Sequence, residues 1–319
     1  MTRYCMQLTR WGCTLVDRDR VLPPGKLPGS ILNDLLDRYM TPDASVLIGP
    51  GVGRDAAAIA IGDTAMVVKT DPITFATADA GRYLVHVNAN DIACMGATPR
   101  WLLVTALFPE RSTTPRMVEE AFAVLATTAR ELGVLLVGGH SEITIGVDRL
   151  IQVGQMIGVC DLSELYDLRT AQPSDAILLA NGIAIEGTAI LATEARGHLN
   201  GLSDDLLDRA AAFLSDPGIS VLPAAGALRE DDVTVRGLHD PTEGGLATAV
   251  VELGEATGLG IELDIDRVPV RPETAAICEV LGLDPLGLIA SGALLAVVAA
   301  LWLANSAREV PVPTRAGLR

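Results

Sequence analysis

Two amides and a carboxylate interrupt an apolar stretch of this 319-residue chain, at Asn88, Asn90 and Asp91. Asn88 and Asp91 are three residues apart and share one face of a predicted helix, whereas Asn90 lies to the side. A buried carboxylate costs several kcal/mol unless it is paired or bound to a metal. We therefore favour a metal ion or another ligand beside Asp91 over the alternative, a hydrogen bond to a backbone N–H or to an arginine such as Arg82.

Two more aspartates lie beside a glycine-rich loop and at the end of a β-branched run. Asp55 follows the loop glycine Gly53 in "GVGRDAAAI". Such a loop can present backbone N–H groups to phosphate, but it lacks the lysine and Ser/Thr of a P-loop, so a surface turn is an equal alternative. Asp71 ends the run "VVKTD" just before Pro72. A carboxylate at a strand exit can hold a metal or can cap a turn.

A third candidate group follows the apolar run "VLLVGGH", which we predict to be a buried strand. Gly139, His140 and Glu142 lie at its end. Sites in α/β sheets tend to form where parallel strands end. A single histidine in such a place is more often a hydrogen-bonding group than a metal ligand, and Mg²⁺ prefers oxygen.

The stretch "HDPTEGGLATA" combines an aspartate with a glycine-rich helix start. Asp240 precedes a proline, and Thr242 is predicted to cap a helix whose first turn contains Gly244 and Gly245. Glycines at a helix N-terminus let an anion approach the free N–H groups. The alternative is an ordinary capping box, for which two adjacent glycines are a poor choice because each weakens a helix by roughly 1 kcal/mol.

The elements that must position these residues alternate between strand and helix patterns in both halves of the chain. An apolar helix at about residues 78–95 carries the amides and Asp91, and the pattern restarts near residues 170–175. We therefore predict an α/β (α+β) fold of two domains. Residues 1–44 form an extension and a helix capped by Ser30, residues 45–168 the first domain and residues 169–319 the second.

Net charge and cysteine usage disfavour several classes of partner and site. The net charge of −16 disfavours a nucleic-acid partner but not a nucleotide, since Mg²⁺ can bridge carboxylates to phosphate. The five cysteines show no C-x-x-C pair, which disfavours structural zinc and fits a reducing cytoplasm. We expect no secretory signal at the start. The uncharged stretch 286–304 is long enough to span a bilayer, but its glycines and its strand pattern favour a buried strand, so we expect a cytoplasmic protein.

Five motifs in this order resemble the ATP-binding superfamily of aminoimidazole ribonucleotide (AIR) synthetase, which includes thiamine-monophosphate kinase, selenophosphate synthetase and the hydrogenase maturation protein HypE. The HypE branch is the most similar. The resemblance covers about residues 25–298. The motifs are "GVGRDAAAI", "KTDPIT", "NANDIACMGATP", "GGHSEIT" and "HDPTEGGL".

The resemblance implies a two-domain PurM-like fold, a homodimer paired through the N-terminal sheets, and ATP with Mg²⁺ in a cleft at that interface. It implies that Asn88 or Asn90 orients Asp91 or touches the nucleotide. It also makes Asp91, His140 and Asp240 candidate catalytic residues, with the role of His140 open. The implied cofactor-binding residues are Gly53, Asn88, Asn90, Gly139, Thr242, Gly244 and Gly245, and the implied metal ligands are Asp55, Asp71, Asp91 and Glu142.

The chemistry shared by the family places the γ-phosphate of ATP on an amide, formyl or related oxygen of a substrate. In HypE that substrate is a carbamoyl group on a C-terminal cysteine, whereas this sequence has no cysteine after Cys278 and departs from the family after about residue 298. We expect a HypE-like protein acting on a small or carrier-bound substrate, with a carbamoyltransferase-type maturation partner as a further candidate. The alternatives are a kinase or synthetase for a thiamine or purine precursor, and a degenerate nucleotide-binding scaffold without turnover.

Overall fold

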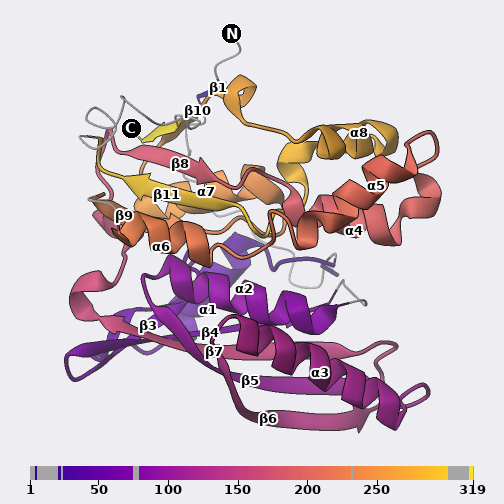
Figure 1. The fold of residues 1–319 in the computed structure, drawn as a ribbon. Coiled ribbons are helices and arrows are strands. Elements are labelled where there is room, and N and C mark those ends of the chain that lie inside the picture. The colour runs from indigo at the N-terminus through magenta and orange to yellow at the C-terminus, as the bar shows by residue number, and fades with distance from the viewer. Residues whose placement is uncertain are drawn as a thin grey trace.

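The computed structural model contains two six-stranded sheets with helices packed on them (Figure 1). The residues that it describes are 4–5, 21–22, 24–74, 79–230, 233–300 and 316–318.

The first sheet has the strand order β2-β3-β4-β7-β5-β6. Only β5 and β6 run parallel among these strands, and the other neighbours are antiparallel. Helices α1 (Gly29–Tyr39), α2 (Ala80–Cys94) and α3 (Pro115–Glu131) belong to this half. The strands are β2 (Val46–Ile48), β3 (Ala57–Ile61), β4 (Thr64–Ile73), β5 (Thr98–Pro109), β6 (Leu135–Thr144) and β7 (Ile151–Asp161).

The second sheet has the order β1-β10-β12-β8-β11-β9, and its printed pairs are all antiparallel. Its strands are β1 (Tyr4–Cys5), β8 (Ala176–Ala180), β9 (Val235–His239), β10 (Ile261–Leu263), β11 (Leu294–Val298) and β12 (Ala316–Leu318). The helices of this half are α4 (Ile185–Glu194), α5 (Asp204–Ala211), α6 (Leu222–Glu230), α7 (Gly245–Thr257) and α8 (Pro272–Leu281).

Helix α2 lies between the two halves and is buried almost throughout (Figure 1). Gly154 and Gly158 of β7 let it approach the first sheet, because a Cβ on Gly154 would lie 2.7 Å from the Asn88 amide nitrogen and one on Gly158 would overlap Ile92. The side chains of Ala93 and Cys94 face the other way and pack against the second sheet. This double burial explains why buried residues occur on all sides of the helix, the polar ones included.

Two local predictions are wrong in this half of the chain. Helix α1 begins at Gly29 with Pro28 as its N-cap, so Ser30 lies inside the helix. Strand β6 is not buried: it is the edge of the first sheet, and its side chains are mostly exposed. The apolar residues of this strand therefore belong to a sheet edge rather than to a core strand, and the pattern of apolar residues alone does not distinguish the two.

The uncharged stretch 286–304 folds as we predicted where it is described. It forms a short turn and then β11, a fully buried strand between β8 and β9. Residues 301–304 lie outside the described residues. None of the helices in the described ranges combines the length and the apolar character that a bilayer crossing needs.

Candidate functional site

Strand β4 and helix α2 bring a buried lysine between two aspartates. The Lys69 ammonium lies 3.2 Å from a carboxylate oxygen of Asp91 and 3.5 Å from one of Asp71. Burial disfavours the charged lysine, but the carboxylates of Asp91 and Asp71 outweigh it and raise the pKa of Lys69 above its usual value. Lys69 was not among the residues predicted from the sequence, although a single lysine in the apolar run "AMVVKTD" indicates a charge that needs a partner.

Asp55 and Asp240 complete a cluster of four aspartates around this lysine. All four, together with Lys69, influence one another electrostatically. Burial raises the pKa of Asp91 and of Asp240. Lys69 beside Asp91, and His239 and Lys69 beside Asp240, offset only part of that rise, to which the neighbouring carboxylates add. One oxygen of Asp240 is buried without a hydrogen-bond partner, and the corresponding oxygen of Asp91 has only the Lys69 ammonium beside it, at 3.2 Å. A divalent cation would satisfy both oxygens and let the carboxylates ionise together.

The histidine that precedes Asp240 holds Asp55 in place. His239 at the end of β9 lies 2.8 Å from the Asp55 carboxylate through Nδ1 and 3.3 Å from Glu252 of α7 through Nε2. Burial lowers the pKa of His239, but Asp55 and Glu252 outweigh it and raise that pKa to about 10. The imidazolium therefore bridges the glycine-rich loop and α7, and sequence reasoning did not single it out.

A second lysine connects the N-terminal segment to the second half. Lys26 donates to the Thr242 hydroxyl at 3.1 Å and lies 3.5 Å from carboxylate oxygens of both Glu243 and Glu252. Thr242 does not cap α7 as we predicted, since the N-cap of that helix is Gly244. The Thr242 hydroxyl instead accepts a hydrogen bond from Lys26.

The two asparagines in α2 bond to backbone rather than standing free. Asn88 accepts from the Asp71 N–H at 3.1 Å and donates to the Leu84 carbonyl at 2.9 Å, so it positions the end of β4. Asn90 donates to the Ile219 carbonyl at 2.8 Å and accepts from the Val221 N–H at 2.9 Å. Asn88 therefore orients an aspartate of the cluster, while Asn90 ties the two halves together.

Three glycines beside the cluster serve close backbone contacts in this structure. Gly53, Gly244 and Gly245 all have positive φ angles. A Cβ on Gly53 would overlap the Glu252 carbonyl, and one on Gly245 would lie 2.5 Å from the Leu286 carbonyl. These contacts dock the loop and the start of α7, which is reason enough for glycine at each position.

Gly139, His140 and Glu142 lie away from the aspartate cluster. The strand register places Asp71 beside Gly154 of β7, Gly154 beside Val104 of β5, and Val104 beside Gly139 of β6. Three strand spacings separate Asp71 from Gly139, roughly 14 Å. His140 and Glu142 are exposed and bond to each other at 3.2 Å. Within this chain, His140 and Glu142 are not part of the aspartate cluster.

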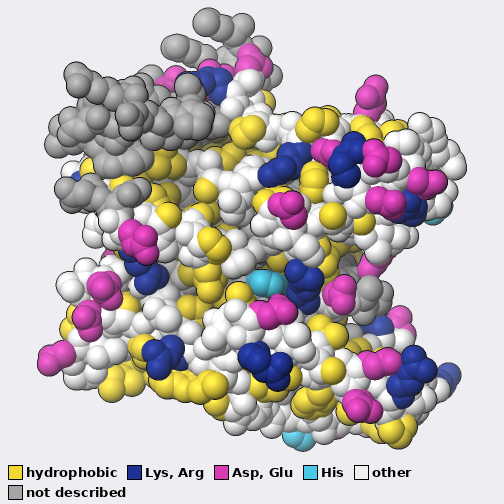
Figure 2. Space-filling model, viewed as in Figure 1, with side chains coloured by type: hydrophobic (Ala, Val, Ile, Leu, Met, Phe, Trp, Pro, Cys, Tyr) yellow, Lys and Arg dark blue, Asp and Glu magenta, His cyan; other side chains and the backbone are white. Residues whose placement is uncertain are grey.

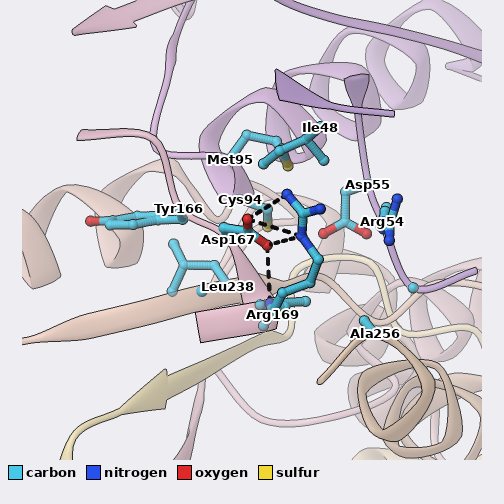
Figure 3. Close-up of a pocket in the computed structure, with 13 residues that line it drawn as sticks. Ile48, Arg54, Asp55, Cys94, Met95, Tyr166, Asp167, Arg169, Leu238 and Ala256 are labelled. Atoms are coloured by element: carbon cyan, nitrogen blue, oxygen red, sulfur yellow. Dashed lines mark hydrogen bonds and ion pairs between the residues drawn. The ribbon is translucent and has the colours of Figure 1, made fainter. Parts of the chain in front are cut away.

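Two pockets adjoin the cluster. One is lined by the Asp55 and Cys94 side chains together with Met95, and Arg169 lies across it, held by Asp167 at 2.6 Å (Figure 3). The other pocket is lined by Asp71 of the cluster. Its other polar lining residues are Thr74, Glu186, Thr242, Glu243 and Ser291. Asp71 therefore faces a pocket, as its place at a strand end predicted.

Comparison with known proteins shows the family of this chain. Residues 53–160 match the model of the AIR synthase related protein N-terminal domain, and residues 172–308 match that of the C-terminal domain. The carbamoyl dehydratase HypE of Cupriavidus necator is 35% identical over 78% of this chain and 70% of its own length. The chain belongs to the AIR synthase-related family, close to HypE. The HypE of Rhodobacter capsulatus is 31% identical over 85% of the chain and 78% of its length.

Solved HypE structures share the fold of this family member. The crystal structure of Escherichia coli HypE superposes with a TM-score of 0.63 at 25% identity, covering 79% of this chain and 78% of that one. A hydrogenase maturation protein HypE solved in complex with ATP gives a TM-score of 0.64 at 28% identity, covering 85% and 82% of the two chains. The predicted two-domain PurM-like fold is thereby confirmed.

Proposed function

We propose that this HypE-like protein binds ATP with Mg²⁺ and transfers the γ-phosphate to an oxygen of a small or carrier-bound substrate. The observation that carries the proposal is the cluster of Asp55, Asp71, Asp91 and Asp240 around Lys69, in which one oxygen of Asp240 is buried without a partner. Lys69 and His239 are two cations against four carboxylates, and a divalent cation would balance the remaining charge. The ATP complex of a HypE structure 28% identical to this chain supports the nucleotide.

The donor set fits magnesium. Mg²⁺ takes oxygen ligands, commonly one or two carboxylates together with substrate phosphates and water. Asp55, Asp71 and Asp91 would hold the ion, which would supply charge neutralisation at the phosphates. Lys69 keeps the cluster compact, because its ammonium lies between Asp71 and Asp91. Asp240 would face the reacting groups as a candidate catalytic carboxylate.

We also propose that two copies of the chain pair through β6. This edge strand exposes Leu135, Val137 and Ile143 by 61%, 53% and 62%. An apolar unpaired edge is unusual in a monomer, because it invites pairing with another strand. Hydrophobic side chains also lie at the surface in the lower half of the molecule, which holds the first sheet (Figure 2). Pairing would place His140 and Glu142 of one copy near the other, where they could join its site.

The domain division at residues 168 and 169 remains part of this proposal, supported by the two matched family domains on either side of it. The relatives named carbamoyl dehydratase support an amide-type oxygen as the acceptor and a carbamoyltransferase-type protein as a partner. A thiamine-monophosphate kinase-like activity or nucleotide binding without turnover remain the competing functions.

Calorimetric titration with a non-hydrolysable ATP analogue, with and without Mg²⁺, tests the site. We expect Mg²⁺-dependent binding that Asp91→Asn abolishes. Asp175→Asn is the matched control, because Asp175 is equally buried and pairs with Arg236 outside the cluster. Absence of binding in folded wild-type protein would overturn the proposal, and binding without ADP formation on any acceptor would favour the scaffold. Sedimentation of Val137→Glu beside the wild type tests the β6 pairing, which predicts a dimer only for the wild type.

A further inference from the structure

The aspartate cluster includes a sulfur atom that magnesium chemistry does not use. Cys94, the last residue of α2, is buried, and its Sγ lies 3.8 Å from an oxygen of Asp240. One ligand atom from each of Asp55, Cys94 and Asp240 lies within 4.8 Å of the other two. Mg²⁺ selects oxygen, whereas thiolate is a ligand of zinc and related softer cations.

The spacing of these atoms suits a small tetrahedral site. Zinc bonds to sulfur at about 2.3 Å and to carboxylate oxygen at about 2.0–2.2 Å, so two such ligands at a tetrahedral angle lie roughly 3.5 Å apart. The distance between Cys94 and Asp240 is 3.8 Å, so only a small inward shift is needed. The second oxygen of Asp240 is buried with no hydrogen-bond partner, which is independent evidence that the carboxylate awaits a ligand.

A route to this site exists. Cys94 and Asp55 line a narrow pocket of about 20 Å³ together with the thioether of Met95 (Figure 3). The Arg169 guanidinium lies across this pocket in the same view, but three hydrogen bonds to the Asp167 carboxylate compensate its charge. The Arg169 side chain is half exposed, and its movement would open the pocket to a cation that has lost most of its water.

We propose that Asp55, Cys94 and Asp240 form a binding site for a thiophilic divalent cation of the Zn²⁺ and Co²⁺ class. Three protein ligands leave a fourth position for water. Binding exchanges the thiol proton of Cys94, released to solvent, for the metal–sulfur bond. Because Asp55 and Asp240 are shared with the proposed magnesium site, a thiophilic cation would compete with Mg²⁺ there, but the proposal itself does not depend on nucleotide binding.

Spectroscopic titration with Co²⁺ tests the site directly. The full chain is used with Cys5 and Cys13 replaced by serine, and Co²⁺ is added under reducing, oxygen-free conditions. We expect a sulfur-to-cobalt charge-transfer band in the near ultraviolet that saturates at one equivalent. Cys94→Ser should abolish the band. Cys160→Ser and Cys278→Ser are matched controls and should keep it, because both of these thiols are also buried but lie outside the cluster.

Two outcomes would overturn the proposal: no band in the folded parent protein, or a band that persists in Cys94→Ser. Should Cys94→Ser fail to fold, Asp240→Asn keeps the thiol and should weaken Co²⁺ binding by about tenfold or more. Unchanged Co²⁺ affinity in that variant would equally refute the site. In the parent protein, Zn²⁺ should protect Cys94 from a thiol reagent, and reaction at the same rate with and without Zn²⁺ would contradict the assignment.

Discussion

Replacing Asn90 by leucine should loosen the junction between the two halves while keeping the size of the side chain. The amide of Asn90 is fully buried and makes two hydrogen bonds across that junction, to the Ile219 carbonyl and from the Val221 N–H. Leucine can make neither bond. The carbonyl and the N–H would then be buried without partners, because α2 and the second half pack tightly around them.

The cost follows from these two groups. Each buried backbone group left unpaired costs about 1–3 kcal/mol, so the free energy of unfolding should fall by about 2–6 kcal/mol. A chain of this size loses about 2–4 °C of melting temperature per kcal/mol. Asn90→Leu should therefore lower the melting temperature by about 5–20 °C, with the local effect centred on the loop at Val221.

Thermal unfolding followed by calorimetry measures the global loss, and amide hydrogen exchange measures the local one. Exchange at Val221 should accelerate more than exchange in the first sheet. Thr193→Val on α4 is a control, because the Thr193 hydroxyl donates only to the Ala189 carbonyl of its own helix and makes no bond across the junction. A melting temperature within about 2 °C of wild type, with Val221 still protected, would refute the view that Asn90 joins the halves.

Three further perturbations test other parts of the structure. Lys69→Met should lower the free energy of unfolding by about 3–5 kcal/mol, because it leaves the Asp91 and Asp71 carboxylates unpaired. In a double-mutant cycle, the same change made in an Asp91→Asn background should cost much less. An equal loss of stability in both backgrounds would contradict the pairing. Burial lowers the pKa of His86 to about 4, below its unfolded value near 6.5, so the stability that the neutral imidazole gives is complete above pH 6.5 and is lost as pH falls toward 4. Urea unfolding at pH 7 and pH 5 should show a loss about 2 kcal/mol larger for wild type than for His86→Gln, and equal losses would refute the shift. Gly158→Ala should cost about 1–3 kcal/mol because its Cβ would lie 2.8 Å from a backbone carbonyl oxygen, whereas Gly197→Ala, with open space around it, should change the urea midpoint little.

Sequence reasoning recovered the elements with strong local signals. The helix expected at residues 78–95 is α2 at Ala80–Cys94. Each of these signals is local, since caps, glycines and apolar periodicity act within one or two turns of chain. The order of the five motifs supplied the family and with it the two-domain fold.

The partners of the site residues could not be predicted in the same way. Lys69, His239 and Cys94 meet the aspartates only because β4, β9 and α2 converge, which is long-range information. His140 and Glu142 are candidates from the sequence because they follow a run predicted to be a buried strand and because the family resemblance implies them. Strand order decides whether that strand is buried, and no pattern inside "VLLVGGH" reports its neighbours.

Helix α2 serves two cores at once. Leu84 and Ile92 pack in the core of the first half, whereas Tyr83 and Cys94 pack in those of the second. Rotation of the halves about a hinge would expose one face of this helix to water, so wide opening between the halves would cost the burial of that face. A fragment ending at residue 168 would carry α2 with one face bare and would aggregate, unless residues 169–319 were supplied in trans to cover it.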